Sequence, residues 1–391
     1  MTALADALLG ATALAWVYWA IALVSVRRHF RGAPPPAAAL PPVSLLKPVR
    51  GIDPGADGAL ESFFRLDYPA YEIVFGVQDA SDPVVPHLER LRAEHPDVPA
   101  RLVVAAAPGP NRKACVLDAL ARAARHEVLV ATDADMSVAP GWLRDVVAAL
   151  SPEDVGLVTC PYRAADPGSL AARLEALHMG VTFLPSAVVA SRLFRMPFAM
   201  GSTMALRRSD LDAVGGFAAL APFLADDYEL GARVGALGRR VVLSSHVVSS
   251  VLGRPRFREV WQREVRWSRC ARAGQTAGHL GYALTFATPL AAAALVASRF
   301  APAGWAALAG SLALRWVVAA GMARATGDAA SLRALALLPL RDALTAVVWA
   351  TALLGRRVVW RGHVFEVDRS GRLHELAGGA SELAPAGSQR A

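Results

Sequence analysis

Two acidic pairs are the first candidates for chemistry in this sequence. Asp133 and Asp135 directly follow the apolar run Val128–Ala131, with one alanine between them. Two carboxylates at this spacing can hold Mg²⁺ or Mn²⁺ on a diphosphate, because hard divalent cations prefer oxygen ligands and keep water and phosphate in the rest of their shell. Asp-x-Asp is common by chance, so the position after a strand carries most of the weight.

The second pair, Asp226 and Asp227, precedes a helical pattern. A helix cap needs only one carboxylate, and a second one beside it is an electrostatic cost unless it has a partner or a task. Neighbouring carboxylates raise the basicity of one member, which suits a general base. We therefore treat this pair as a candidate for proton abstraction.

Two weaker signals lie near ends of predicted elements. Asp79 ends the strand-like run 73–77 and has two interpretations: it binds a nucleotide base or ribose, or it forms an Asx turn, which turn chemistry alone favours. Lys113 stands at a helix start opened by Asn111, where backbone donors and a lysine charge suit a phosphate. Ordinary solvated capping explains that helix start equally well.

A fifth candidate site is the Arg- and Trp-rich segment ahead of the second apolar region. Arg263 and Arg266 are three residues apart and share one helical face. A helix of this kind can lie in the membrane interface with Trp261 and Trp267 at headgroup level and its arginines directed at phosphate. A juxtamembrane basic anchor is the alternative interpretation.

Short apolar runs alternate with helical patterns along the part of the sequence that contains the acidic residues. The sheet that these runs predict would hold the acidic residues in place. The predicted strands are 43–46, 73–77, 102–105, Val128–Ala131 and 155–160, and the predicted helices include 86–95, 113–124 and 141–150. The pattern predicts an α/β fold with a mostly parallel sheet covered on both faces. Ligands of such sheets bind beyond the carboxyl ends of the strands, where Asp79, Asp133 and Asp135 stand.

Apolar segments at both ends of the sequence predict a membrane protein. The run 3–26 is long enough to span a bilayer, and Arg27, Arg28 and Arg31 after it place the following domain in the cytoplasm. A signal peptide would carry its positive charge before the apolar run. Three C-terminal segments, 282–296, 305–322 and 332–354, are candidate spans, and charged residues in the last favour a re-entrant or interfacial course for part of it.

Composition supports this division. Hydrophobic residues make up 54% and charged residues 19% of the 391 residues, which fits a soluble domain joined to bilayer-spanning segments. The net charge of +8 comes from arginines beside apolar stretches, a pattern that favours anionic lipid over nucleic acid. Three widely spaced cysteines argue against a disulfide framework. The predicted parts are an N-terminal helix with basic flank (1–31), a cytoplasmic catalytic domain (32–255), an interfacial helix (256–279), C-terminal spans (280–355) and a basic tail (356–391).

In order along the chain, the candidates are Asp79, Asp133-x-Asp135, Asp227 and Arg263-x-x-Arg266-Trp267. This order resembles the processive and lipid-modifying glycosyltransferases with an A-type nucleotide-sugar-binding fold, whose pattern is Asp, DxD, Asp and (Q/R)xxRW. The nearer resemblance is to ceramide glucosyltransferases and related hopanoid-biosynthesis glycosyltransferases, over roughly 42–362. Further matching stretches are 77–79, 111–113, 201–204, 224–228 and 359–362.

The resemblance implies a role for each matching residue. Asp79 would contact uracil or ribose, Lys113 the diphosphate, and Asp133 and Asp135 the ribose and the metal ion. Asp227 would be the general base, although the Glu-Asp pair frequent at that position is Asp226-Asp227 here, which leaves Asp226 as the alternative. The remaining implied contacts, to the diphosphate and the acceptor, are those of Arg263, Arg266 and Trp267.

The implied activity is inverting transfer of a sugar from a UDP-sugar to a hydroxyl of a membrane lipid, at the cytoplasmic face of the inner membrane. A hopanoid polyol with UDP-N-acetylglucosamine and ceramide with UDP-glucose are the two acceptor and donor pairs. A processive polysaccharide synthase is the alternative, but three C-terminal spans are few for a polymer channel. The Arg263 to Trp267 motif argues against a polyprenyl-phosphate sugar transferase. A transporter should show repeats and broken helices, and a nucleotide-binding regulator would have no use for Asp227.

Overall fold

The computed structural model describes residues 2–32, 39–52, 56–106, 108–360 and 363–376, so the linker expected at 32–42 lies largely outside the described residues. The helices are α1 (Ala3–His29), α2 (Ala56–Glu61), α3 (Val85–Glu94), α4 (Arg112–Ala123), α5 (Trp142–Leu150), α6 (Leu170–His178), α7 (Leu184–Arg192), α8 (Arg208–Ala213), α9 (Asp226–Ala236), α10 (Phe257–Gly274), α11 (Thr276–Gly281), α12 (Ala287–Ala297), α13 (Pro302–Ala325), α14 (Ala329–Ala334) and α15 (Leu338–Leu353). The strands are β1 (Val43–Pro48), β2 (Tyr71–Val77), β3 (Ala100–Val104), β4 (Val128–Ala131), β5 (Met136–Ser137), β6 (Val155–Thr159), β7 (Tyr162–Ala165), β8 (Met204–Arg207), β9 (Arg240–Leu243), β10 (Val248–Val251), β11 (Arg357–Trp360), β12 (His363–Val367) and β13 (Leu373–Glu375).

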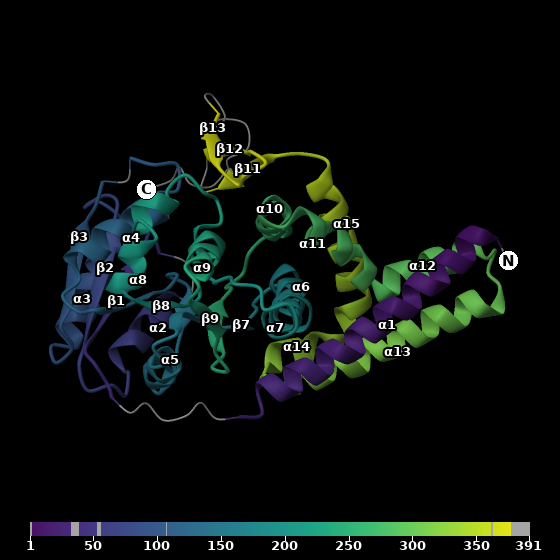
Figure 1. Cartoon of the computed structure of the whole chain (residues 1–391), viewed down its shortest axis with the longest axis horizontal. Coiled ribbons are helices and arrows are strands. Elements are labelled where there is room, and N and C mark those ends of the chain that lie inside the picture. Colours follow the sequence, from purple (N-terminus) through teal and green to yellow (C-terminus); the bar gives the residue numbers. More distant parts are fainter. Residues whose placement is uncertain (1, 33–38, 53–55, 107, 361–362, 377–391) are drawn as a thin grey trace.

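A seven-stranded sheet organises the α/β domain that follows α1. Its strand order is β3-β2-β1-β4-β8-β6-β9, and only β8 runs antiparallel to its two neighbours. Helices cover both faces (Figure 1). Adjacent residues of β1 show why its sequence is continuously apolar: Leu45 packs into the core on one face and Leu46 into the core on the other. The predicted α/β fold with a mostly parallel sheet is confirmed.

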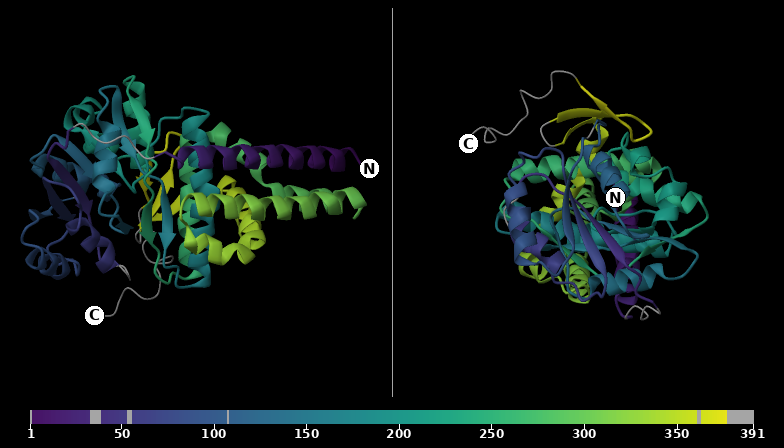
Figure 2. Two further views of the ribbon diagram at one scale, coloured as in Figure 1. Left: turned by 90° about the horizontal axis from the view of Figure 1, so that it is seen from below. Right: turned by 90° about the vertical axis from the view of Figure 1, so that its left-hand side faces the viewer.

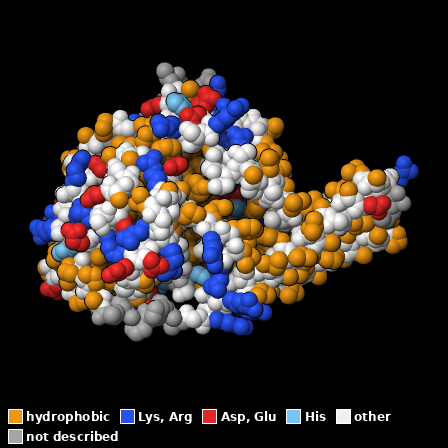
Figure 3. All heavy atoms as spheres, in the orientation of Figure 1, with side chains coloured by type: hydrophobic (Ala, Val, Ile, Leu, Met, Phe, Trp, Pro, Cys, Tyr) orange, Lys and Arg blue, Asp and Glu red, His pale blue; other side chains and the backbone are white. Residues whose placement is uncertain are grey.

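A helical arm projects from this domain. It consists of α1 beside α12 and α13, with the N-terminus toward its far end (Figures 1 and 2). The α1 helix begins at the cap Thr2, whose hydroxyl accepts from the amide of Ala5, and its last turn holds Arg27 and Arg28. Hydrophobic side chains cover most of the visible arm surface (Figure 3).

By length and composition, four helices of the described chain can cross a membrane, or up to five if a bent pair counts as one span. The bent pair corrects the continuous segment expected at 282–296, because Thr276–Thr285 and Ala287–Ala297 meet at 64°. The break coincides with Phe286, which has ψ 63° and so leaves the helical region.

Two charged residues of the last apolar segment, Arg341 and Asp342, are buried in the protein, whereas Arg333 is exposed. Arg341 donates to the carboxylate of Glu264 at 2.7 Å, and Arg315 pairs with Asp342 at 2.8 Å. Each pair links helices that are far apart in sequence. Internal pairing therefore accounts for Arg341 and Asp342 within the apolar segment Ala329–Leu353.

One long apolar helical segment, Leu170–Arg192, was missing from the sequence prediction. It joins α6 to α7 through a π-helical turn at Met179–Phe183. The helix is mostly buried within the protein, with 72% of its apolar window out of solvent, so packing explains its composition. Pro185 directly follows this π-helical turn, where the regular α-helical hydrogen-bond pattern is already interrupted.

The basic tail expected after residue 355 is structured over its described part. Strands β11, β12 and β13 form an antiparallel sheet whose inward residues, among them Val358, Phe365 and Leu373, alternate with exposed ones. This sheet reaches back to the segment just ahead of α9: the amide of Leu373 donates to the carbonyl of Pro222 at 2.7 Å, and Leu224 donates to Gly371 at 3.2 Å. The interfacial helix expected at 256–279 also differs, since it ends at Gly274 and a separate α11 follows.

Candidate active site

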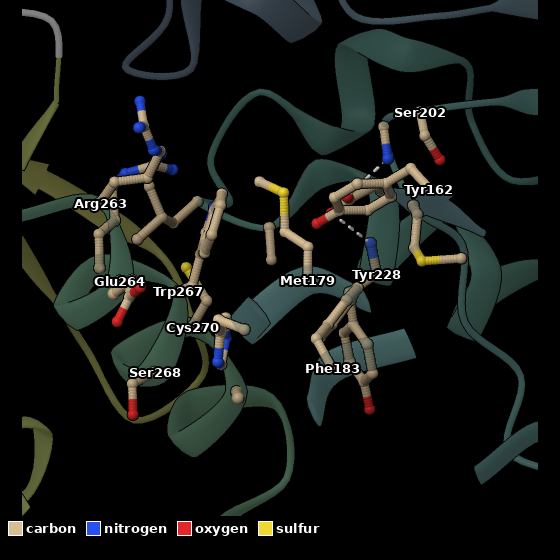
Figure 4. Close-up of a pocket in the computed structure, with 18 of the residues that line it drawn as sticks. Tyr162, Met179, Phe183, Ser202, Tyr228, Arg263, Glu264, Trp267, Ser268 and Cys270 are labelled. Carbon is tan, nitrogen blue, oxygen red and sulfur yellow. Dashed lines mark hydrogen bonds between the residues drawn. The ribbon is translucent and has the colours of Figure 1, made fainter. Parts of the chain in front are cut away.

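A cavity of about 1710 Å³ brings together the ends of several elements. Its polar end lies beyond β4, at the first turns of α4 and α9, and α10 forms an opposite wall. Figure 4 shows part of the cavity lining, with Arg263 and Trp267 on one side and Tyr162 and Ser202 on the other. The sheet edge predicted to bind a ligand is therefore part of a single large cavity.

Lys113 connects two of the predicted acidic residues. Its Nζ lies 2.8 Å from Oδ1 of Asp133 and 3.2 Å from Oδ2 of Asp226. Burial alone would lower the pKa of Lys113, but the carboxylates of Asp133, Asp226 and Asp227 together raise it above its ordinary value. The lysine therefore stays charged and offers a fixed positive group at the start of α4.

Asn111 explains why α4 starts at this place. Its side-chain oxygen accepts from the amide of Ala114 at 3.0 Å, and its side-chain nitrogen donates to Asp226 at 3.1 Å and to the carbonyl of Phe223 at 2.9 Å. One fully buried amide thus caps α4 and holds the segment before α9. Sequence reasoning identified the helix start but not this second contact.

The backbone of Gly201 links one residue of each acidic pair. Its amide donates to Oδ2 of Asp227 at 2.8 Å, and its carbonyl accepts from the amide of Asp133 at 2.8 Å. A Cβ at this position would lie 2.3 Å from Oδ2 of Asp133 and 3.0 Å from Nζ of Lys113. The close approach therefore requires glycine here for a packing reason, which sequence alone did not reveal.

Asp227 is the member of its pair suited to accept a proton. Burial, Asp226 and Asp133 raise the pKa of Asp227 to about 6, although Lys113 opposes them. Its carboxylate also accepts from the amide of Tyr228 at 2.8 Å and lines the cavity. Asp226 is 5% exposed, lines the same cavity and is held by Lys113 and Asn111.

The oxygen ligands near Asp135 fit a divalent cation. Burial and the neighbouring Asp133 raise the pKa of Asp135, and Ser250 donates to its Oδ2 at 2.9 Å. Part of this shift comes from the repulsion between the two carboxylates, which a bound cation would relieve. Among the residues described here, no three His, Cys, Asp or Glu side chains form a ready metal cage. A cation would therefore take its remaining ligands from diphosphate and water.

Lys47 is a site-adjacent residue that sequence analysis missed. Its Nζ donates to the carbonyl of Asp133 at 2.6 Å and to Oγ1 of Thr132 at 2.7 Å, and it lies 3.9 Å from the centre of the Phe63 ring. Burial lowers the pKa of Lys47 to about 7, although Asp135 and Asp133 oppose this shift. The available signal was a lysine in an otherwise apolar strand.

The α10 motif lines the cavity with its three marked residues. Arg263 makes a bidentate contact with the fully buried Glu175, at 2.5 and 2.6 Å. The Arg266 guanidinium lies 5.8 Å from the ring centre of Trp360. Trp267 stacks on His178 with 15° between the rings. Glu175 therefore orients Arg263, a partner that no local sequence signal indicated.

Asp79 lies apart from this cluster. It is exposed and its Oδ1 accepts from both the amide and the hydroxyl of Ser81 at 2.8 Å. Those two hydrogen bonds lower the pKa of Asp79. In this structure Asp79 forms the Asx turn, and its neighbour Gln78 lines the cavity instead.

The far end of the cavity is apolar. It is lined there by Leu14 from α1, Leu284 ahead of α12, and Val348 and Trp349 from α15. Polar groups there are few: the hydroxyls of Tyr18 and Ser186 are hydrogen-bonded at 3.0 Å, and Arg341 and Thr345 of α15 also line the cavity. One continuous cavity thus joins a charged end at the sheet to an apolar end among membrane-type helices.

Comparison with known proteins gives consistent matches. The family model of glycosyl transferase family 21 matches residues 7–373. Ceramide glucosyltransferase 1 of Caenorhabditis elegans is 27% identical over 223 residues, covering 56% of this chain and 47% of that protein. Ceramide glucosyltransferase of Komagataella phaffii is 32% identical over 114 residues, covering 28% of this chain and 22% of that protein. The matched part spans about half the length, or less, of these relatives.

A solved structure supports the fold. The mannosyltransferase PcManGT of Pyrobaculum calidifontis, in complex with GDP-Man and Mn²⁺, superposes with a TM-score of 0.54 at 22% sequence identity. The match covers 90% of this chain and 98% of that one. At this identity the likeness concerns the fold, and it extends from the sheet into the helices.

Proposed function

Since this chain belongs to glycosyl transferase family 21, we propose that it is an inverting glycosyltransferase that moves a sugar from a UDP-sugar to a hydroxyl of a membrane lipid. The observation that carries this proposal is the single cavity with a charged and an apolar end. A nucleotide diphosphate matches the charged end and a lipid matches the apolar end. A soluble acceptor would leave the apolar end without use.

The proposed chemistry assigns proton transfer to Asp227. A lipid hydroxyl is a poor nucleophile, and a positioned carboxylate that takes its proton contributes about 10²–10⁴-fold. A pKa of about 6 keeps Asp227 mostly deprotonated at neutral pH while it remains a stronger base than an ordinary aspartate. The alkoxide attacks the anomeric carbon from the face opposite the leaving group, so the configuration inverts.

The proposed donor site surrounds the leaving diphosphate with positive groups. Lys113 lies at the start of α4, whose amides add partial positive charge, and Arg266 lies on the wall formed by α10. We assign Mg²⁺ or Mn²⁺ to Asp133 and Asp135, where the bound ion would stabilise the negative charge of the departing diphosphate. Asp133 also contacts the ribose in this proposal, and Arg263 and Trp267 border the diphosphate and acceptor.

Membrane position follows the same proposal. The chain is an integral protein of the inner membrane, and the catalytic domain faces the cytoplasm, where UDP-sugars are available. Arg27 and Arg28 at the end of α1 support that side by the positive-inside rule. We retain Asp79 as a proposed contact to the uracil or ribose of the donor. This contact requires the loop that carries Asp79 to move toward the cavity when the UDP-sugar binds.

Two acceptor and donor pairs are to be compared. Ceramide with UDP-glucose is the pair that corresponds to the names of the relatives. A hopanoid polyol with UDP-N-acetylglucosamine is the second pair, suggested by the sequence resemblance. Purified full-length protein in nanodiscs receives each pair with Mg²⁺ or Mn²⁺, and mass spectrometry of extracted lipids measures the product.

We expect a mass gain of one hexose or one N-acetylhexosamine on one lipid. Asp227→Asn should lower turnover by about 10²–10⁴-fold and leave UDP binding intact. Asp212→Asn, an exposed aspartate on α8, is the matched control and should keep wild-type turnover. Ladders of many sugars would establish the processive alternative. UDP binding without transfer to either lipid would contradict both proposed pairs.

A further inference from the structure

A separate cavity lies where α1 and α13 end together. It has a volume of about 760 Å³ and shares no lining residue with the large cavity. Three arginines line it: Arg27 and Arg31 from the end of α1 and beyond, and Arg324 from the last turn of α13. Its other lining residues are Phe30, Trp316, Val317, Ala320, Gly321, Ala325 and Leu335.

All of the charged side chains that line this cavity are positive. All three arginines are exposed, and the lining of the cavity contains no carboxylate. No salt bridge joins any of the three to an acidic side chain within the part of the chain that the structure describes. The negative ends of the helix dipoles favour a cation at each terminus, but they leave most of the positive charge of this cluster uncompensated.

Close packing places Arg27 against α13 at the cavity. A Cβ on Gly321 would lie 3.2 Å from a terminal nitrogen of Arg27 and 2.9 Å from Leu23. The guanidinium of Arg27 therefore packs against α13 at Gly321, where there is no side chain to keep it away. Basic side chains also gather at the foot of the helical arm in Figure 3.

Apolar surface continues from the charged end along the arm. Trp316 and Val317 on α13 are 47% and 66% exposed. The indole of Trp316 donates to the carbonyl of Leu335 at 3.0 Å, which fixes the ring beside the cavity. A charged group capped by an aromatic ring and followed by apolar helix surface has the profile of a phospholipid: phosphate, interface and acyl chain.

We propose that this cavity binds the phosphate of one anionic phospholipid, with an acyl chain lying along Trp316 and Val317. The lipid would bridge the ends of α1 and α13, and its phosphate would neutralise part of the positive charge of the three arginines. This site does not depend on the proposed transfer reaction. It differs from general attraction to an anionic surface because it requires one bound lipid, held by residues of two helices.

Native mass spectrometry of the full chain in a non-ionic detergent tests this site. The protein is titrated with dioleoyl-phosphatidylglycerol or dioleoyl-phosphatidylcholine. We expect one phosphatidylglycerol to bind at least tenfold more tightly than phosphatidylcholine. Arg27→Gln with Arg324→Gln should weaken phosphatidylglycerol binding by about 25-fold, because each arginine near an anionic headgroup contributes about fivefold.

Three controls separate the alternatives. Arg299→Gln, an exposed arginine at the opposite end of α13, should leave binding unchanged. Arg27→Lys with Arg324→Lys keeps the charge and should retain most of the preference, which excludes misfolding as the cause. Equal binding of both lipids, or unchanged binding in the glutamine variant, would overturn the proposal. Displacement of the lipid by millimolar inorganic phosphate would do the same, since it would identify a simple anion site.

Discussion

Gly201→Ala tests how the carboxylates of the site are held. The added Cβ would lie 2.3 Å from Oδ2 of Asp133, whereas ordinary contacts of such an atom start at 3.4 Å. The φ angle of Gly201 lies outside the left-handed region, so alanine adds no backbone strain. Asp133 must therefore retreat from its contact with Lys113 by about 1 Å, and a shift of about 1 Å in a catalytic group costs about 10²-fold in rate.

Steady-state kinetics with the active acceptor and donor pair measure this effect. We expect kcat/KM to fall by about 10²-fold, while the melting temperature in detergent stays close to that of the wild type. Gly141→Ala is the control, because no atom lies within 4 Å of its added Cβ. If Gly201→Ala kept kcat/KM within a few-fold of the wild type, the inferred coupling between Asp133, Lys113 and Asp227 would be wrong.

Three further predictions concern the base, the metal ion and the buried ion pair. Since Asp227 must be deprotonated, kcat/KM should rise with pH through a midpoint near 6, where it is half of its maximum, and level off at higher pH. A pH profile flat from 5 to 7 would argue against this base. Chelation with EDTA should abolish turnover and Mn²⁺ or Mg²⁺ should restore it, whereas full activity in EDTA would contradict the assignment to Asp133 and Asp135. Arg341→Leu leaves the carboxylate of Glu264 buried without its partner and should lower the free energy of unfolding by about 3–5 kcal/mol. Adding Glu264→Leu should recover most of that loss. Equal thermal melts of wild type and Arg341→Leu would show that the pair does not contribute to stability.

Much of the sheet could be predicted because its strands are apolar and short. β4 was predicted to the residue, whereas β2 starts two residues earlier than expected. The reason is Glu72, a buried carboxylate within β2 that accepts from Ser44 at 2.7 Å and from the amide of Arg125 at 2.7 Å. A polar residue whose partners lie far along the chain looks like a strand boundary when only neighbouring residues are considered.

The candidate site was predictable where chemistry and sequence position coincide. Asp133, Asp135 and Asp227 follow a strand or open a helix, and the structure brings them around one cavity. Partners that depend on long-range contact were not predictable: Glu175 reaches Arg263 across 88 residues. Asp79 shows the opposite case, because local turn chemistry explains its position in this structure without a ligand.

The C-terminal sheet has a consequence for the biogenesis of the protein. Its residues Gly371 and Leu373 hydrogen-bond the segment just before Asp226, yet the ribosome makes them about 150 residues later, an interval on the order of ten seconds at usual synthesis rates. During this interval α12, α13 and α15, which belong to the candidate membrane-spanning segments, are synthesised. We expect the acidic pair to reach its final geometry only after the anchor is complete, and protease protection of the segment around residue 224 should appear only in nascent chains extended past residue 373. The cell would then have no active enzyme before it has an inserted one.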